Sequence, residues 1–181
     1  MQRAPEQRVR MMMRAVMRAL LLCLFAANAV ADDPPFEDAL LDKLVGSWLM
    51  TGTIAGGEVV HDVEINWVLG HRYVRIDDVA RETNEDGGPA YEATVFIGWD
   101  KPTGRYVCLW LDLTGGGGLA NDVFGYAGPA ADRLEFTWGD DEGRIRNTFQ
   151  YFADTDSWTW SIDNEKHGVA TPFGRVALAR K

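Results

Sequence analysis

The chain has few of the residues on which metal-binding and nucleic-acid-binding sites depend. Its 181 residues contain 18 basic and 27 acidic side chains, so a basic face for phosphate contacts is not expected. It has two cysteines and three histidines, and none of them forms a His-x-His or Cys-x-x-Cys pair of the kind that binds zinc. These shortages argue against a nucleic-acid-binding protein and against a dedicated metal site.

Familiar catalytic motifs are missing as well. After residue 31 the chain has three serines, Ser47, Ser157 and Ser161, and none lies in the Gly-x-Ser-x-Gly motif of hydrolases. The glycines at 115–118 lack the lysine and the following helix of a phosphate-binding loop, so a flexible hairpin loop or rim is favoured. No motif assigns a catalytic residue, and the sequence leaves open whether the protein is an enzyme.

The sequence also lacks an apolar run long enough to cross a membrane, which takes about 20 residues. The apolar run at 19–27 follows a segment with five arginines and one glutamate, and Ala29-Val30-Ala31 comes after it. A basic segment, a short apolar run and an A-x-A ending are typical of a secretory signal peptide. We expect residues 1–31 to be removed, which gives a periplasmic or secreted protein without membrane contact. An uncleaved membrane anchor is the alternative.

The remaining residues, 32–181, are expected to form a single domain. They hold 13 basic and 26 acidic side chains, for a net charge of −13. Cys108 is their only cysteine, so no internal disulfide can form, and we expect its thiol to be buried and unreactive. Hydrophobic residues make up 46% of the sequence and aromatic residues 11%, which argues against disorder and provides for a packed core.

Hydrophobic periodicity predicts one helix followed only by strands. Apolar residues recur at helical spacing between Phe36 and Val45, in a helix of about ten residues that we expect to begin with Asp33 as its cap and to end at Gly46. Beyond Gly46, apolar and polar residues alternate, as in strands with two different faces. Turn residues separate ten predicted strands, which are 47–55, 58–69, 72–80, 90–99, 105–113, 119–127, 132–138, 144–153, 157–164 and 173–180.

This order of elements predicts an all-β fold. Because no second helix interrupts the strands, folds built of βαβ units are excluded. Short connections make neighbouring strands antiparallel, and closure of such a series removes its exposed edges. The predicted fold is an antiparallel up-and-down β-barrel of about ten strands with one short N-terminal helix, and a β-sandwich is the alternative.

Several short motifs resemble those of a bacterial lipocalin-like family, domain of unknown function 1579. The segment Leu41-x-x-Leu44-x-Gly46-x-Trp48 resembles the opening of lipocalin-type barrels. Three later segments resemble the family's pattern in order, with His71 in place of a glycine, and they are 69–74, 96–100 and 104–112. The resemblance covers about residues 40–165. It implies a lipocalin-like (calycin-like) barrel around a central cavity, and it supplies no reaction and no catalytic residue.

The same resemblance implies how one end of the barrel closes. In lipocalins an arginine of the last strand lies across the tryptophan that follows the first turn. This implies structural roles for Gly46 and Trp48, with Arg175 or Arg180 as the arginine, through a cation–π contact.

Residues that could line a cavity lie at alternate positions of three predicted strands. A barrel cavity is typically lined by aromatic side chains and a few polar groups, and the sequence does not decide which strand faces point inward. An arginine inside would attract the carboxylate of a fatty-acid-like ligand. The candidate cavity residues are Tyr106, Trp110, Asp112, Trp158, Trp160, Arg144 and Arg146.

We therefore expect a monomer or homodimer that binds a small apolar or amphipathic molecule without a cofactor. One alternative is an enzyme of the isomerase or lyase type that uses Asp112 or His61 as a base in the same cavity. Another is a haem-binding barrel, by analogy with nitrobindin-like proteins, in which His167 would be the axial ligand.

Overall fold

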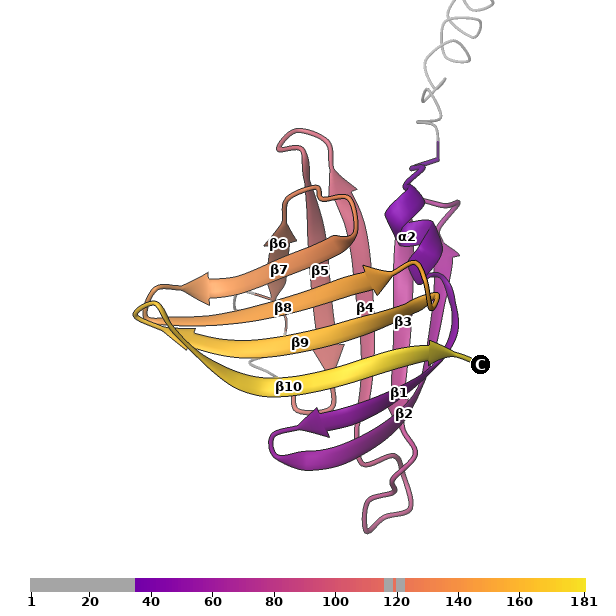
Figure 1. Ribbon diagram of the computed structural model, residues 1–181, viewed down its shortest axis with the longest axis vertical. Helices are drawn as coiled ribbons and strands as arrows, with labels where there is room; N and C mark the ends of the chain where they lie inside the picture. The colour runs from indigo at the N-terminus through magenta and orange to yellow at the C-terminus, as the bar shows by residue number, and fades with distance from the viewer. Residues whose placement is uncertain (1–34, 116–118, 120–122) are drawn as a thin grey trace, which may run out of the picture. The chain divides into compact units, whose positions relative to one another are not determined.

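The computed structural model describes residues 35–115, 119 and 123–181, and the predicted signal peptide lies outside them. Among these residues no helix is long and apolar enough to span a membrane. The described chain has one short helix, α2 (Ala39–Leu44), followed by ten strands (Figure 1). The strands are β1 (Gly46–Ile54), β2 (Gly57–Val68), β3 (Tyr73–Ala80), β4 (Glu92–Asp100), β5 (Arg105–Asp112), β6 (Phe124–Ala127), β7 (Arg133–Asp140), β8 (Gly143–Phe152), β9 (Ser157–Lys166) and β10 (Val169–Arg180).

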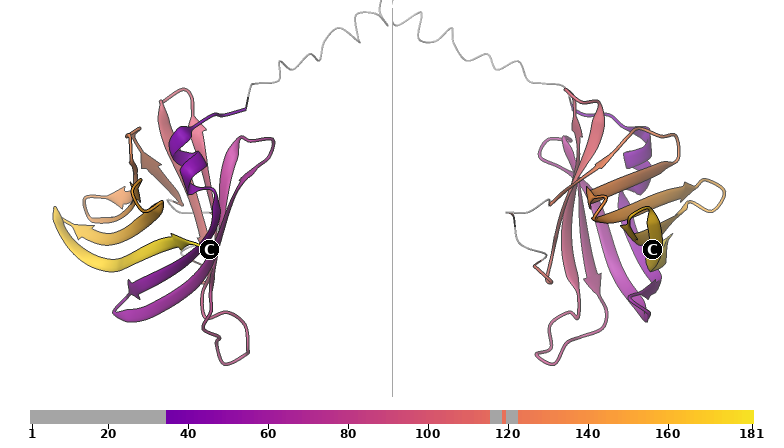
Figure 2. Two further views of the ribbon diagram at one scale, coloured as in Figure 1. Left: turned by 45° about the vertical axis from the view of Figure 1, so that its right-hand side comes forward. Right: turned by 90° about the vertical axis from the view of Figure 1, so that its left-hand side faces the viewer.

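The ten strands form a closed antiparallel barrel, which confirms the predicted fold. Each strand pairs with its neighbours in the sequence, and β1 pairs with β10 to complete the ring. This last pairing excludes the β-sandwich, whose two sheets would stay open. In Figures 1 and 2, β3–β6 form one layer of the barrel, and β7–β10 with β1 and β2 form a second layer whose strands run across the first.

The helix is shorter than predicted and begins later. The carboxylate of Asp38 accepts hydrogen bonds from the backbone N–H groups of Leu40 and Leu41, both at 2.9 Å. Asp38 is therefore the N-cap, and the helix cannot begin after Asp33 as predicted. Three leucines of its six residues are buried, so the helix covers the end of the barrel where β1 begins. We call this the closed end and the opposite one the open end.

A stacked tryptophan and arginine fasten the closed end. Trp48 is fully buried, and its indole Nε1 donates a hydrogen bond to the carbonyl of Leu44 at 2.8 Å. The guanidinium carbon of Arg180 lies 4.2 Å from the centre of the Trp48 ring, the geometry of a cation–π contact. The same guanidinium donates to the carbonyls of Lys43 and Val45, at 3.1 and 3.0 Å, and so ties the helix to β10.

The sequence predicted either Arg175 or Arg180 as the arginine of this contact. The structure shows that it is Arg180, so the prediction of Arg175 was wrong. Its guanidinium donates to the carbonyl of Ile162 at 2.9 Å and pairs with the carboxylate of Asp163. Arg175 alternates with the buried residues of β10 and therefore lies on the outward face of the barrel.

The β6–β7 seam is the least paired part of the barrel. A single residue pair, Tyr126 with Thr137, joins the two strands. The side chain of Trp138 supplements it, because its Nε1 donates to the carbonyl of Val123 at 3.3 Å. The Trp138 ring also lies so close to Gly125 that a Cβ there would stand 2.3 Å from it.

Burial of the inward faces falls from the closed end to the open end. Along β5, the inward Tyr106 and Cys108 are buried, whereas Trp110 and Asp112 are partly exposed. Along β9, Trp158 is fully buried and Ile162 is partly exposed. The inside of the barrel is thus a packed core at the closed end, and on β5 and β9 solvent reaches the inward face toward the open end.

The closed end yields a stability prediction. Gly46 has φ of +142°, and a Cβ at this position would stand 2.3 Å from Nη1 of Arg180. We expect Gly46→Ala to displace the arginine from Trp48 and to lower the free energy of unfolding by about 1–3 kcal/mol, the usual cost of overpacking. Denaturant titration of both proteins measures the difference.

Gly128→Ala is the matched control, because nothing lies within 4 Å of a Cβ at that exposed position. It should change the free energy of unfolding by less than about 0.5 kcal/mol. Equal stability of the Gly46→Ala variant and the wild type would show that the contact between Arg180 and Trp48 does not fasten the closed end.

Candidate functional site

The inward face of β5 carries three of the predicted cavity residues, and β9 carries two. Tyr106 and Trp158 lie near the closed end, where Trp158 donates from Nε1 to the carbonyl of Lys43 at 3.3 Å. Their positions make them part of the core under α2. Trp110, Asp112 and Trp160 lie nearer the open end, where Trp110 and Asp112 are partly exposed and Trp160 is buried beside Trp110.

The expected arginines inside the barrel are not there. Along β8 the buried positions are Asn147 and Phe149, so the alternating Arg144 and Arg146 lie on the outward face. Both pair with Glu165 on the neighbouring strand β9, Arg144 with an N–O distance of 3.2 Å. The prediction that Arg144 and Arg146 line the cavity was therefore wrong, because on the outward face they pair with a carboxylate and contact water.

A tyrosine that the sequence analysis did not single out joins the open-end residues. The hydroxyl of Tyr91, the residue before β4, lies 3.3 Å from Oδ2 of Asp112, to which it donates. It accepts a hydrogen bond from Nε1 of Trp110 at 3.2 Å. The Tyr91 ring also stacks on the imidazole of His61, with ring centres 5.7 Å apart and planes inclined by 26°. Tyr91 therefore links groups of β2 and β5.

His61 in turn forms a buried pair with Asp78 of the adjacent strand β3. Its Nδ1 lies 2.7 Å from Oδ1 of Asp78, and both side chains are less than 5% exposed. A carboxylate in this position fixes the orientation of the imidazole. Asp78 could have been found in the sequence, because it interrupts the apolar series Val74, Ile76 and Ala80 at the inward positions of one strand.

Aromatic side chains from non-adjacent strands contact one another in the barrel interior, beside the polar groups of Tyr91 and Asp112. The ring centres of Trp110 and Trp160 are 5.4 Å apart, although β5 and β9 are not neighbours in the sheet. Trp160 also packs on Phe149, with ring centres 4.3 Å apart. This contact brings the polar groups of β5 and of β8–β9 to one region of the barrel.

Two polar atoms in this region are buried without a hydrogen-bond partner among the described residues. They are Nε1 of Trp160 and Oδ1 of Asn147, whose residues are 2% and 4% exposed. The residues lie on adjacent strands, since Asn147 pairs in register with Ile162, two positions from Trp160. An unpaired buried polar atom costs about 1–3 kcal/mol, so two side by side mark an unusual place in the core.

The region is acidic. The inward titratable groups toward the open end are His61, Asp78, Tyr91 and Asp112. No described lysine or arginine is buried among them, and Lys166, which has the inward alternation of Trp160, lies at the exposed tip of β9. The interior therefore offers carboxylates, one imidazole, one amide oxygen and aromatic faces, without a buried lysine or arginine among the described residues.

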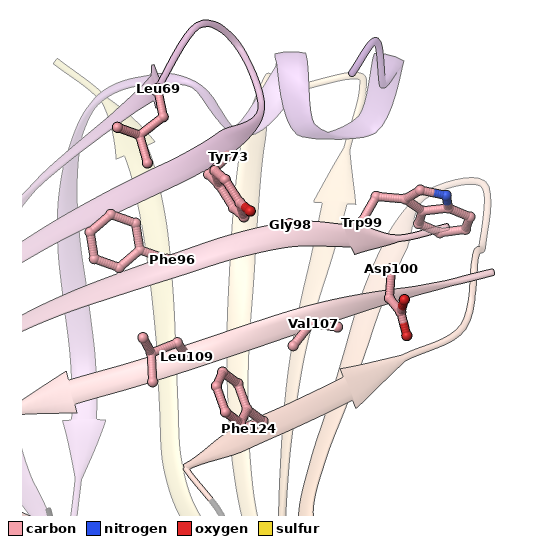
Figure 3. A pocket seen from close by; sticks show the side chains of 9 residues that line it. All are labelled: Leu69, Tyr73, Phe96, Gly98, Trp99, Asp100, Val107, Leu109 and Phe124. Carbon is pink, nitrogen blue, oxygen red and sulfur yellow. The ribbon is translucent and has the colours of Figure 1, made fainter. Parts of the chain in front are cut away.

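A second apolar surface lies outside the barrel, on β3–β6 (Figure 3). It is a groove of about 480 Å³ in which Phe96, Leu109 and Phe124 stand on the outward face. Tyr73 lies flat against Gly98, where a Cβ would be 2.6 Å from its ring. The sequence did not predict this groove, because β5 carries apolar residues on both faces and either face could have been the inner one.

The remaining histidines occupy turns. His167 is exposed in the turn between β9 and β10, with Nε2 3.8 Å from a carboxylate oxygen of Glu142. His71 adopts φ of +63° after β2, and its ring stacks on Trp67 with centres 4.0 Å apart. Within the described ranges, no group of three or more His, Cys, Asp or Glu residues is placed to hold a metal ion.

A scan against protein-family models found no match to this chain, and a search of curated proteins found none either. The function of the protein is therefore inferred from the geometry of the barrel.

A buried thiol and a buried tyrosine hydroxyl make the stability of the barrel depend on pH in the alkaline range. Burial raises the pKa of the Cys108 thiol and of the Tyr91 hydroxyl well above their ordinary values. The unfolded chain ionises first, so the stability contributed by the neutral groups is complete below about pH 8.5 and is lost as the pH rises further. We expect the melting temperature to fall between about pH 8.5 and 11.

The Cys108→Ala variant distinguishes the contribution of the thiol to this pH dependence from that of the Tyr91 hydroxyl. The variant should melt lower at neutral pH, because Cys108 is fully buried, but its melting temperature should fall less between about pH 8 and 10. Parallel curves for the variant and the wild type would contradict the assignment of this pH dependence to the Cys108 thiol.

Proposed function

We propose that the protein binds a small, largely apolar molecule inside the open end of the barrel. The observation that carries this proposal is the pair of buried, unpaired polar atoms, Nε1 of Trp160 and Oδ1 of Asn147, beside the aromatic contact that crosses the interior. A donor on a bound molecule would satisfy Oδ1 of Asn147, and an acceptor would satisfy Nε1 of Trp160. Binding sites for small molecules commonly combine such apolar walls with a few polar groups.

The exposure of the inward faces supports access from the open end. Trp110 and Asp112 point inward and are nevertheless partly exposed, so a molecule from solvent can reach them. Because Trp110 and Trp160 touch across the interior, we propose a ligand no larger than a few fused rings or a short chain.

The amino-terminal sequence pattern supports a periplasmic or secreted location for this binding protein. The motifs from Leu41 to Trp48 and from Gly104 to Asp112 support a place among lipocalin-like barrels. We propose that the barrel acts as a monomer or homodimer and needs no cofactor to bind its ligand.

The buried His61–Asp78 pair supports a second candidate function, catalysis in the same site. An imidazole oriented by a carboxylate is a common general base, and such a base contributes about 10²–10⁴-fold to a rate. If a bound compound is turned over, His61→Gln should lower kcat by about 100-fold or more. A His61→Gln variant with unchanged kcat would exclude this role for His61.

Binding inside the barrel can be separated from binding in the outer groove with two neighbouring residues of β5. Trp110 points inward, and Leu109 lines the outer groove. We expect the neutral fluorescent dye prodan to bind inside, and Trp110→Ala to weaken binding by about 1.5–3 kcal/mol, the worth of burying one large apolar side chain. Fluorescence titration of the full chain measures the affinity.

Leu109→Ala is the control and should leave the affinity for prodan unchanged. Circular dichroism melts of both variants establish that they are folded under the conditions of the titration. A loss of affinity in Leu109→Ala with none in Trp110→Ala would place the dye in the outer groove and would contradict a binding site inside the barrel.

A further inference from the structure

The charge of the open-end residues specifies the kind of ligand. The carboxylate of Asp112 accepts hydrogen bonds from Tyr91 at 3.3 Å and, on its other oxygen, from the backbone N–H and hydroxyl of Thr114 at 2.8 and 2.5 Å. No cationic side chain of the described residues pairs with it. A carboxylate has about four lone-pair positions, so the partly exposed Asp112 can still accept a donor from a ligand.

The unpaired acceptor adds to this preference. Oδ1 of Asn147 is buried and lacks a donor among the described residues. Asn147 lies two positions beyond Phe149 toward the open end and Asp112 two positions beyond Trp110, and both Phe149 and Trp110 contact the Trp160 ring. An ammonium group has three donors and no acceptor, and it is attracted to the faces of aromatic rings. An anionic head group would instead meet the Asp112 carboxylate without a compensating arginine, because Arg144 and Arg146 lie outside.

We propose that the ligand is a small organic cation, a protonated amine with an apolar body, whose ammonium group binds between Asp112 and Asn147. This inference rests on the proposed binding site inside the barrel and replaces the fatty-acid-like ligand that an inward arginine would have suited. The net charge of −13 of residues 32–181 adds a general attraction for cations.

Three compounds with the same phenyl body test the charge preference. They are phenethylamine, phenethyl alcohol and phenylacetate, and their binding to the full chain can be measured by isothermal titration calorimetry at neutral pH. We expect the amine to bind about tenfold more tightly than the alcohol, the worth of one charge-assisted hydrogen bond, and phenylacetate to bind most weakly.

Substitutions assign the preference to its residues. Asp112→Asn should reduce the advantage of the amine over the alcohol about tenfold while the alcohol binds as before. Asp154→Asn is the control, because it makes the same change of charge in an exposed turn at the closed end. Asn147→Leu, which keeps the volume and removes the unpaired oxygen, should also weaken the amine selectively and does not depend on the folding of the Asp112 variant.

The outcomes separate this inference from the proposed function. Equal binding of the alcohol and the amine, or tighter binding of phenylacetate, overturns the cationic ligand and leaves a binding site in the barrel. Retention of the amine preference in both Asp112→Asn and Asn147→Leu overturns the assignment to these residues. If none of the three compounds binds, the binding site itself fails, and the inference fails with it.

Discussion

The pairing of β1 with β10 is the constraint on which the rest of the structure depends. Seven residue pairs, from Trp48 with Arg180 to Ile54 with Gly174, join the two ends of the strand series into a ring. This pairing creates an inside, and it sets Arg180 beside the Trp48 ring so that the first and last strands hold the helix over one end. The opposite end has no such cover among the described residues, and there the inward Trp110 and Asp112 are partly exposed.

Closure also explains which parts of the fold could be predicted. The strands follow from alternation along the chain, because a barrel wall has one face toward the core and another toward water. Alternation fails to orient β5, where Val107 and Leu109 outside are as apolar as Tyr106 and Cys108 inside. Only the pairing of all ten strands decides which face is enclosed. On β8, Arg146 lies outside and pairs with Glu165 of β9, and this pairing between strands could not be recognised from the sequence around Arg146.

The site was less predictable than the fold because its members come from separate strands. Trp110 and Asp112 were visible as neighbours on one face, but Tyr91, Asp78 and Asn147 acquire meaning only when the barrel places them beside these residues. The outward position of Arg144 and Arg146, which were predicted to point inward, changes the chemistry of the site. With Arg144 and Arg146 outside, the interior contains carboxylates and aromatic faces without a lysine or arginine, so the ligand that we propose is an amine and not an acid.

A crystal structure of the full chain with phenethylamine tests this account most directly, because it locates the amino nitrogen. We expect that nitrogen within about 3.2 Å of the Asp112 carboxylate and of Oδ1 of Asn147, with the phenyl ring against Trp110 and Trp160. The compound in the outer groove of Phe96, Leu109 and Phe124, or inside the barrel with its nitrogen away from both residues, would contradict the account.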